Sequence, residues 1–187
     1  MMMTPGCERR KAVWGCIVAV VMMAAPVFAQ SDPVESARGL YASAAYDDAL
    51  TMLDGLRSSA ERSAIGPIEY YRALCLLALG KPTDADSAIE AAVDAMPFAQ
   101  PSASDSSPRV RAAFREVRRR VLPAIIEQRY DDAKAAFDRK DAAAAERFRE
   151  VIKLVDEPDI QDIAGQPALS QIRALASDYF ALSAQRQ

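Results

Sequence analysis

The feature that most constrains this chain is the spacing of its apolar residues, which recur every three or four positions in short segments that come in pairs. That spacing places them on one face of an amphipathic helix. In the first pair, Asp32-Pro33 offers an N-cap and a proline at the first helical position, and Tyr46 opens the second helix. For the second pair, we expect one helix from Gly66-Pro67 to Leu79 and its partner from Asp84 to Met96.

Composition supports a helical fold. Residues 30–187 contain 32 alanines but only five glycines, a balance that suits packed helices and disfavours the tight turns of β-sheets. We therefore predict one all-α domain of ordinary size over residues 30–187.

The first 29 residues are typical of an export signal. Arg9, Arg10 and Lys11 form a basic region, an uncharged run of 14 residues follows, and small residues at Val27 and Ala29 precede Gln30. The run is shorter than the about 20 residues that span a bilayer. We expect a signal peptide over residues 1–29, cleavage before Gln30 and a periplasmic or secreted protein with no integral membrane span. An uncleaved N-terminal anchor is the alternative.

The residues that most enzymes use are missing. The chain has no histidine, which excludes Ser-His-Asp and Cys-His catalysis and histidine zinc sites. It also lacks a glycine-rich phosphate loop, a G-x-S-x-G elbow and a CxxC pair. After the expected cleavage Cys75 is the one remaining cysteine, and its alanine- and leucine-rich surroundings predict a small buried hydrophobe. We expect no enzyme activity, no cofactor and no metal site.

The two pairs resemble tetratricopeptide repeats, which are helix-turn-helix units of about 34 residues with small residues where the helices cross. Ala49 and Ala85 occupy matching small positions 36 residues apart, and Pro97 follows the second pair as the family's terminal proline does. The resemblance implies an antiparallel stack of helix hairpins with a concave binding face. Helical hairpins that are not repeats are the alternative. The positions that carry the resemblance are Ala37, Leu40, Ala49, Leu53 and Leu56 in the first unit, and Ala73, Leu76, Ala85, Ile89, Ala92 and Pro97 in the second.

The remainder of the domain breaks the period and then resumes it. Residues 30–97 hold the first two pairs, and residues 98–108, rich in proline and serine, predict an exposed linker. Over residues 109–158 we expect an arginine-rich helix, kinked or restarted at Leu122-Pro123, and then a third helix pair. Over residues 159–187 we expect a capping helix that covers the end of the stack.

Residues 107–158 are also similar to helical-repeat regions of exported bacterial proteins, some of which carry a proline-rich stretch and a TonB-type domain after the repeats. The likeness lies in Ser107-Pro108-Arg109-Val110-Arg111, in Arg118-Arg119-Arg120 with Leu122-Pro123, and in residues 134–141. It implies an envelope location and a helper role. We expect no transducer domain, because the sequence ends at Gln187.

In a stack of this kind the first helices of the pairs line the concave face and offer aromatic, cationic and apolar anchors to a protein partner. The alternative is that the tyrosines among them only seal the helix packing. The candidate partner-binding residues are Arg38, Tyr41, Tyr70, Leu77, Tyr130 and Lys134.

A second group of candidate partner-binding residues lies in the segment from 109 to 120, which holds six arginines and one glutamate. We expect Arg111, Arg115, Arg118 and Arg119 to form a cationic surface beside an apolar helical stripe. That surface either binds an anionic envelope component, such as lipid or wall polymer, or pairs with acids of the same chain. Nucleic acid is not an expected partner, because the protein is exported and net acidic with few interleaved aromatic residues.

Two classes of function follow from these features. The first is a non-catalytic adaptor that binds a protein partner through its concave face. The second is a structural subunit of an envelope assembly or of a self-oligomer. An exposed groove on a monomer favours the first, and concentration-dependent oligomers favour the second.

Overall fold

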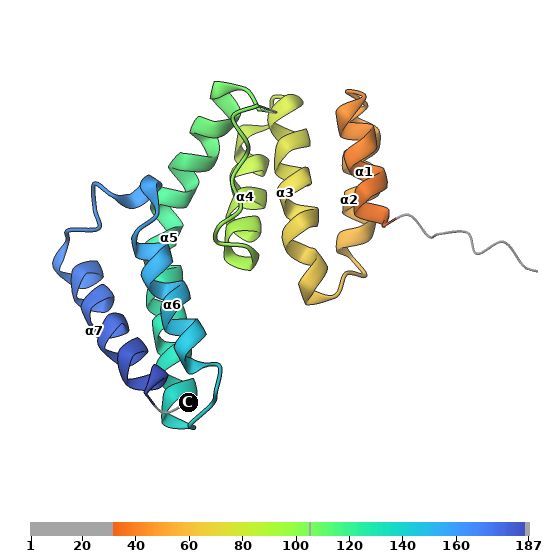
Figure 1. Cartoon of the computed structure of the whole chain (residues 1–187). Helices are drawn as coiled ribbons and strands as arrows, with labels where there is room; N and C mark the ends of the chain where they lie inside the picture. The colour runs from red at the N-terminus through yellow and green to blue at the C-terminus, as the bar shows by residue number, and fades with distance from the viewer. Residues whose placement is uncertain (1–31, 105, 186–187) are drawn as a thin grey trace, which may run out of the picture. The chain divides into compact units, whose positions relative to one another are not determined.

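A computed structural model describes residues 32–104 and 106–185. Within these residues it contains seven α-helices, one short 3-10 helix and no strand, which confirms the predicted all-α class (Figure 1). The expected signal peptide, residues 1–29, lies outside the described residues. The elements are α1 (Pro33–Ala42), α2 (Tyr46–Arg57), α3 (Arg62–Ala78), α4 (Pro82–Ala95), α5 (Pro108–Asp138), α6 (Ala144–Val155), η1 (Pro158–Ile160) and α7 (Pro167–Ala184).

Helices that follow one another in the sequence pack together. Each of α1 to α6 contacts the next helix along the chain, α7 packs on α6 and α5, and α1 also contacts α3. These helices form three pairs, α1–α2, α3–α4 and α5–α6, and a short turn joins the two helices of each pair (Figure 1). The predicted N-cap of the first pair is confirmed, because the Asp32 carboxylate accepts from the backbone N–H of Val34 at 3.0 Å.

The turns inside these three pairs have the same backbone geometry. Each contains one residue with a positive φ, which is 62° at Ala44, 71° at Gly80 and 58° at Lys140. The N–H of that residue donates to the carbonyl three residues earlier, and the next N–H donates to the carbonyl five residues earlier. This is the Schellman motif, which satisfies carbonyl groups at a helix end. The three pairs are therefore alike where their helices reverse direction.

Small residues mark the same place in each pair. Ala37, Ala73 and Ala133 lie seven residues before the positive-φ residue of their turn, and each is 0% exposed. Ala49 and Ala85, which the sequence places at helix crossings, are also 0% exposed. Because alanine adds only a methyl group, the backbones can approach closely at these positions.

Helix α3 begins earlier than the sequence predicts. The predicted start at Gly66-Pro67 is wrong, because α3 begins at Arg62 and includes both residues. Pro67 lacks the N–H that would bond to the Ser63 carbonyl, but Ser63 is exposed, so that carbonyl can be solvated. Gly66 is buried and faces Met96, which follows α4.

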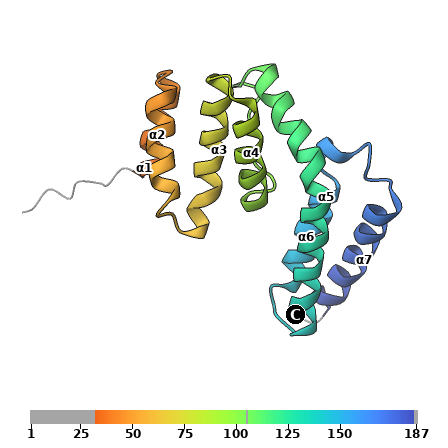
Figure 2. The ribbon, with the colours of Figure 1, turned by 180° about the vertical axis from the view of Figure 1, so that it is seen from behind.

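Helix α5 joins two predicted elements into one. It runs for 31 residues without a break at Pro123, so the arginine-rich helix and the first helix of the third pair are continuous. The prediction of a restart is wrong, and the alternative of a kink fits Figure 2, where α5 changes direction along its length. The predicted apolar stripe is confirmed, because Phe114 and Val117 are each 1% exposed.

The C-terminal helix has two distinct faces. Leu169 and Ala176 of α7 are buried in the main core, which also contains Phe148 of α6. Leu175 and Leu182 are 36% and 47% exposed and lie on the other face.

Candidate functional site

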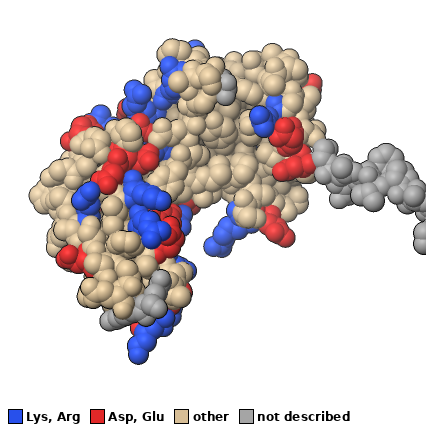
Figure 3. Space-filling view, viewed as in Figure 1, with Lys and Arg blue, Asp and Glu red and all other residues tan. Residues whose placement is uncertain are grey.

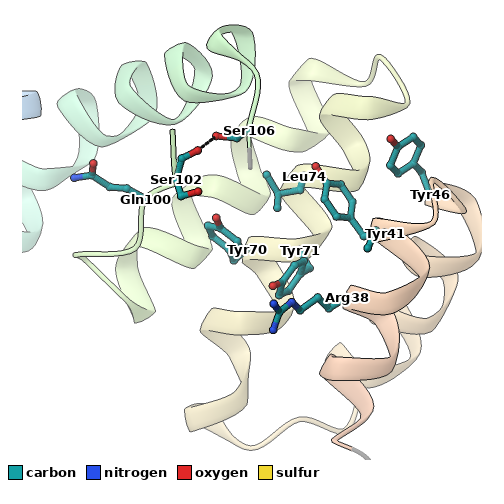
Figure 4. Close-up of a pocket in the computed structure, with 10 residues that line it drawn as sticks. Arg38, Tyr41, Tyr46, Tyr70, Tyr71, Leu74, Gln100, Ser102 and Ser106 are labelled. Atoms are coloured by element: carbon teal, nitrogen blue, oxygen red, sulfur yellow. Dashed lines mark hydrogen bonds between the residues drawn. The ribbon is translucent and has the colours of Figure 1, made fainter. Parts of the chain in front are cut away.

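Tyrosine side chains gather at one cleft of the molecule. Four of the chain's six tyrosines line a cavity of about 520 Å³, together with Arg38, Leu74 and polar side chains from the segment between α4 and α5. Tyr41 comes from α1, Tyr46 from the first position of α2, and Tyr70 and Tyr71 from the middle of α3. Figure 4 shows Tyr70 and Tyr71 between Tyr41 and Tyr46 on one side and Gln100, Ser102 and Ser106 on the other. We call this cavity the tyrosine cleft.

The tyrosine rings hold one another in place. The ring centroids of Tyr41 and Tyr46 are 5.5 Å apart, and those of Tyr70 and Tyr71 are 5.4 Å apart and nearly perpendicular. Tyr41 also meets Tyr71 edge-on, and Tyr70 packs against buried Phe114 of α5 with centroids 5.5 Å apart. Rings in these edge and tilted geometries stabilise one another beyond the area they bury. The cleft is therefore preorganised, and its rings are half-buried.

The chemistry of the cleft is aromatic and polar with one cation. Among the described lining residues Arg38 is the charged one, and its Nη1 lies 3.2 Å from Glu35 in an exposed ion pair. Burial raises the pKa of Tyr41, with smaller contributions from nearby Tyr46, Cys75 and Tyr71. The Tyr41 phenol therefore stays protonated at neutral pH and can act as a hydrogen-bond donor.

The structure brings only part of the first predicted set together. Arg38, Tyr41 and Tyr70 meet in the tyrosine cleft. Leu77 is half-buried, packs against the main core and is not among the residues that line the cleft. Tyr130 packs on Phe148 at 6.1 Å between centroids, as a residue that seals helix packing does.

Lys134, the sixth residue of that set, is also away from the cleft. Its Nζ lies 3.0 Å from the Asp138 carboxylate, one turn further along α5. Sequence reasoning missed seven residues that line the cleft, which are Ala42, Tyr46, Tyr71, Leu74, Gln100, Ser102 and Ser106. The adjacency of Tyr70 and Tyr71 was the available signal, because neighbouring positions on a helix diverge by about 100° and can line a wide cleft.

The arginines of the second predicted set have partners within the chain. Arg115 Nε is 3.5 Å from Asp159, and Arg119 pairs with Asp162. Arg111 donates to the backbone carbonyls of Ala103 and Ser106. On the face that Figure 3 shows, basic and acidic side chains lie next to one another over the region of α5 to α7.

The environment of Arg118 differs most from the expected cationic surface. Its side chain is 0% exposed, so the expectation that it belongs to a cationic surface is wrong. A buried guanidinium must be neutralised and hydrogen-bonded, and Glu157 and Asp159 supply both. These acids lie about 40 residues further along the chain, which hides the pairing from local sequence patterns.

A second buried charge lies near the turn after α2. Glu69 of α3 is 1% exposed. Its Oε1 lies 2.5 Å from Arg57 Nε in an ion pair, and its Oε2 accepts from Arg72 at 2.7 Å. Arg72 also pairs with Asp54 of α2 at 2.7 Å. Every group of this cluster has a partner of opposite charge, which is the arrangement expected of a structural cross-link between α2 and α3.

The described residues include no cluster of three or more acidic or cysteine side chains that could hold a metal ion. Among the described helices, none combines the length and the hydropathy that crossing a membrane requires. Comparisons with protein-family models, with curated protein sequences and with solved structures found no match to this chain.

Proposed function

We propose that this chain is a non-catalytic adaptor of the cell envelope, exported by its N-terminal segment, that binds a segment of a protein partner in the tyrosine cleft. The observation that carries the proposal is the gathering of four of six tyrosines around one cavity of about 520 Å³. Tyrosine supplies a large contact area at low conformational-entropy cost, and its hydroxyl adds directional hydrogen bonding. Residues of this kind act as anchors at protein interfaces.

The arrangement of the pairs supports a repeat-like adaptor. Three helix pairs share the same turn geometry and a fully buried alanine seven residues before it. Stacked helix pairs of this kind leave a face lined by first helices, where an extended or helical segment can lie. Tyr41 and the Tyr70-Tyr71 pair belong to the first helices of the first two pairs. We propose on this basis that the pairs are tetratricopeptide-like.

The competing functions have less support. Binding to an anionic surface requires arginines that are available to it, yet Arg111, Arg115, Arg118 and Arg119 all have partners within the chain.

Assembly into a self-oligomer is tested by light scattering over a wide range of protein concentrations. A mass that rises with concentration would favour the structural-subunit class.

The adaptor proposal is tested by site-specific photocrosslinking in envelope extract from the host. In one variant, photoreactive p-benzoylphenylalanine replaces Tyr46 in the cleft. In the control variant it replaces Met52, an apolar residue of α2 that is 37% exposed and lies outside the cleft. We expect a defined crosslinked partner from position 46 that is absent from position 52 and weakened by Tyr71→Ala. Identical crosslinks from both positions contradict the proposal.

A further inference from the structure

The segment after α4 forms one wall of the tyrosine cleft. We call residues 96–104 the strap. Its two prolines, Pro97 and Pro101, are buried, whereas Gln100 and Ser102 are exposed and line the cleft. The sequence predicts an exposed linker over residues 98–108, and most of the described residues in this range are exposed. The strap is nevertheless packed onto the helices at two points. Its position is therefore fixed by specific contacts.

The first contact is made by Arg118 of α5, which holds the backbone of the strap. Its Nη1 donates to the Pro97 carbonyl and, at 3.3 Å, to the Ala99 carbonyl. The same guanidinium donates from Nε to Asp159 and from Nη2 to Glu157, each at 2.6 Å. Because arginine presents its donors in a rigid planar fork, one side chain can join the strap, α5 and the segment around η1.

The second contact comes from the strap itself. Gln100 donates from Nε2 to Glu157 at 2.8 Å, to the same carboxylate oxygen that accepts from Arg118. A residue that lines the cleft is thus joined to the buried ion pair through one shared carboxylate. Arg118 thus holds the strap backbone directly and is linked to the Gln100 side chain through their shared partner Glu157.

We propose that Arg118 is a positioning residue for the cleft, which holds the strap as a polar wall opposite the tyrosines. The amide and hydroxyl groups of Gln100 and Ser102 suit the backbone N–H and C=O groups of an extended peptide, while the tyrosine rings accept its side chains. The strap thereby favours extended peptides over a purely apolar occupant. The nature of the occupant rests on the proposed function, but the fixing of the strap by Arg118 does not.

The first test uses the full chain without any ligand. Arg118→Lys keeps the charge but cannot reproduce the fork, and Arg119→Lys is the matched control, because Arg119 is 51% exposed and pairs with Asp162 away from the strap. Amide hydrogen exchange at Ala99, whose N–H donates to the Met96 carbonyl at 2.9 Å, should accelerate about tenfold or more in Arg118→Lys and be unchanged in Arg119→Lys. Equal exchange in all three proteins overturns the proposal.

A spectroscopic readout separates positioning from a general loss of stability. With 3-fluorotyrosine incorporated, ¹⁹F resonances of the cleft tyrosines should shift in Arg118→Lys, while those of Tyr130 and Tyr179, which pack against α6, should stay in place. Shifts of all six resonances would indicate global loosening and count against the proposal. If Arg118→Lys does not fold, Gln100→Ala replaces it, because Gln100 is exposed and its loss should still raise exchange over the strap.

A third test measures peptide binding. Peptides that bind the wild-type chain are selected from a displayed random library. Selected peptides that depend on Tyr71 should lose affinity about tenfold in Arg118→Lys and keep it in Arg119→Lys. Unchanged affinity in Arg118→Lys overturns the role of the strap in binding. Failure to select any Tyr71-dependent peptide counts against the proposed function, whereas the exchange result stands apart from it.

Discussion

Gly66 and Met96 are in direct contact, and a side chain at Gly66 would collide with the methionine. A Cβ atom built at Gly66 would lie 2.5 Å from Cγ and 2.9 Å from Sδ of Met96, closer than real Cβ contacts allow. Because Met96 directly follows α4, this contact fixes how the end of that helix approaches α3.

The first prediction follows from that contact. Gly66→Ala should destabilise the fold by about 1–2 kcal/mol, since overpacking outweighs the better helix propensity of alanine. Gly39→Ala and Gly55→Ala are matched controls in helices with no atom within 4 Å of the new Cβ, and each should stabilise the fold by about 0.5–1 kcal/mol. Urea unfolding of the three variants provides the measurement. A stabilised Gly66→Ala would show that Met96 moves aside freely.

The second prediction concerns the shared turns. Left-handed backbone costs a non-glycine residue about 1 kcal/mol or more, and φ is 71° at Gly80 and 58° at Lys140. Gly80→Ala should therefore destabilise the protein, whereas Lys140→Gly should stabilise it by about 0.5–1 kcal/mol. Thermal unfolding measures both changes. Arg139→Gly is the control, because φ at Arg139 is −79° and glycine gains nothing there.

Much of this fold could be predicted from local sequence patterns. The cap at Asp32, the start of α2 at Tyr46 and the break at Gly80 depend on residues only a few positions apart. Such interactions are visible in the sequence, because helix caps and turns involve neighbouring groups. The same holds for Ala49 and Ala85, whose burial follows from helical spacing.

The parts that could not be predicted depend on contacts between distant segments. Arg118 looks like one more solvated arginine until Asp159, 41 residues away, is placed beside it. Proline and glycine at 66–67 are typical of a helix start, but the packing of Gly66 on Met96 keeps them inside α3. The tyrosine cleft likewise combines α1, α2, α3 and the strap, so only Arg38, Tyr41 and Tyr70 could be selected from helix order alone.

The third prediction concerns the pH dependence of stability through Cys75. The side chain is fully buried, and this burial raises the pKa of its thiol from 9.0 to about 11. The unfolded chain therefore releases the thiol proton above pH 9, while the folded chain keeps it until about pH 11. The folded state binds more protons in that window, so stability falls as pH rises through it.

Urea unfolding at several pH values between 9 and 11 measures this loss. Cys75→Ala should flatten the dependence, apart from what the tyrosines contribute. Reaction of the native protein with a thiol reagent at pH 8 should also be slow and should become fast in denaturant. Rapid labelling of Cys75 itself in the native protein contradicts its burial.

The fourth prediction concerns export. The order of basic region, apolar run and small residues predicts cleavage between Ala29 and Gln30. N-terminal sequencing or intact-mass measurement of the protein from its host tests this directly. A change of Ala29 to Arg, which signal peptidase does not accept, should leave the precursor uncleaved. A wild-type chain that still begins near Met1 contradicts the prediction.

The last prediction compares the stability contributions of three arginines of α5, which the local sequence pattern does not distinguish. Arg115 and Arg119 are 66% and 51% exposed, and exposed ion pairs contribute about 0–1 kcal/mol, so Arg115→Gln and Arg119→Gln should change stability little. Arg118 is 0% exposed, and Arg118→Gln would leave Glu157 and Asp159 without their buried partner. Breaking such a pair costs about 3–5 kcal/mol.

Glutamine has similar helix propensity in all three places, so the comparison isolates the environment of each side chain. Urea unfolding of the three variants should therefore show one large loss, at Arg118. Losses of equal size would mean that the three guanidinium groups are equally solvated and that the strap is held by other contacts. A high-salt repeat adds a second criterion, because salt should screen the pairs of Arg115 and Arg119 but leave the cost at Arg118 nearly unchanged.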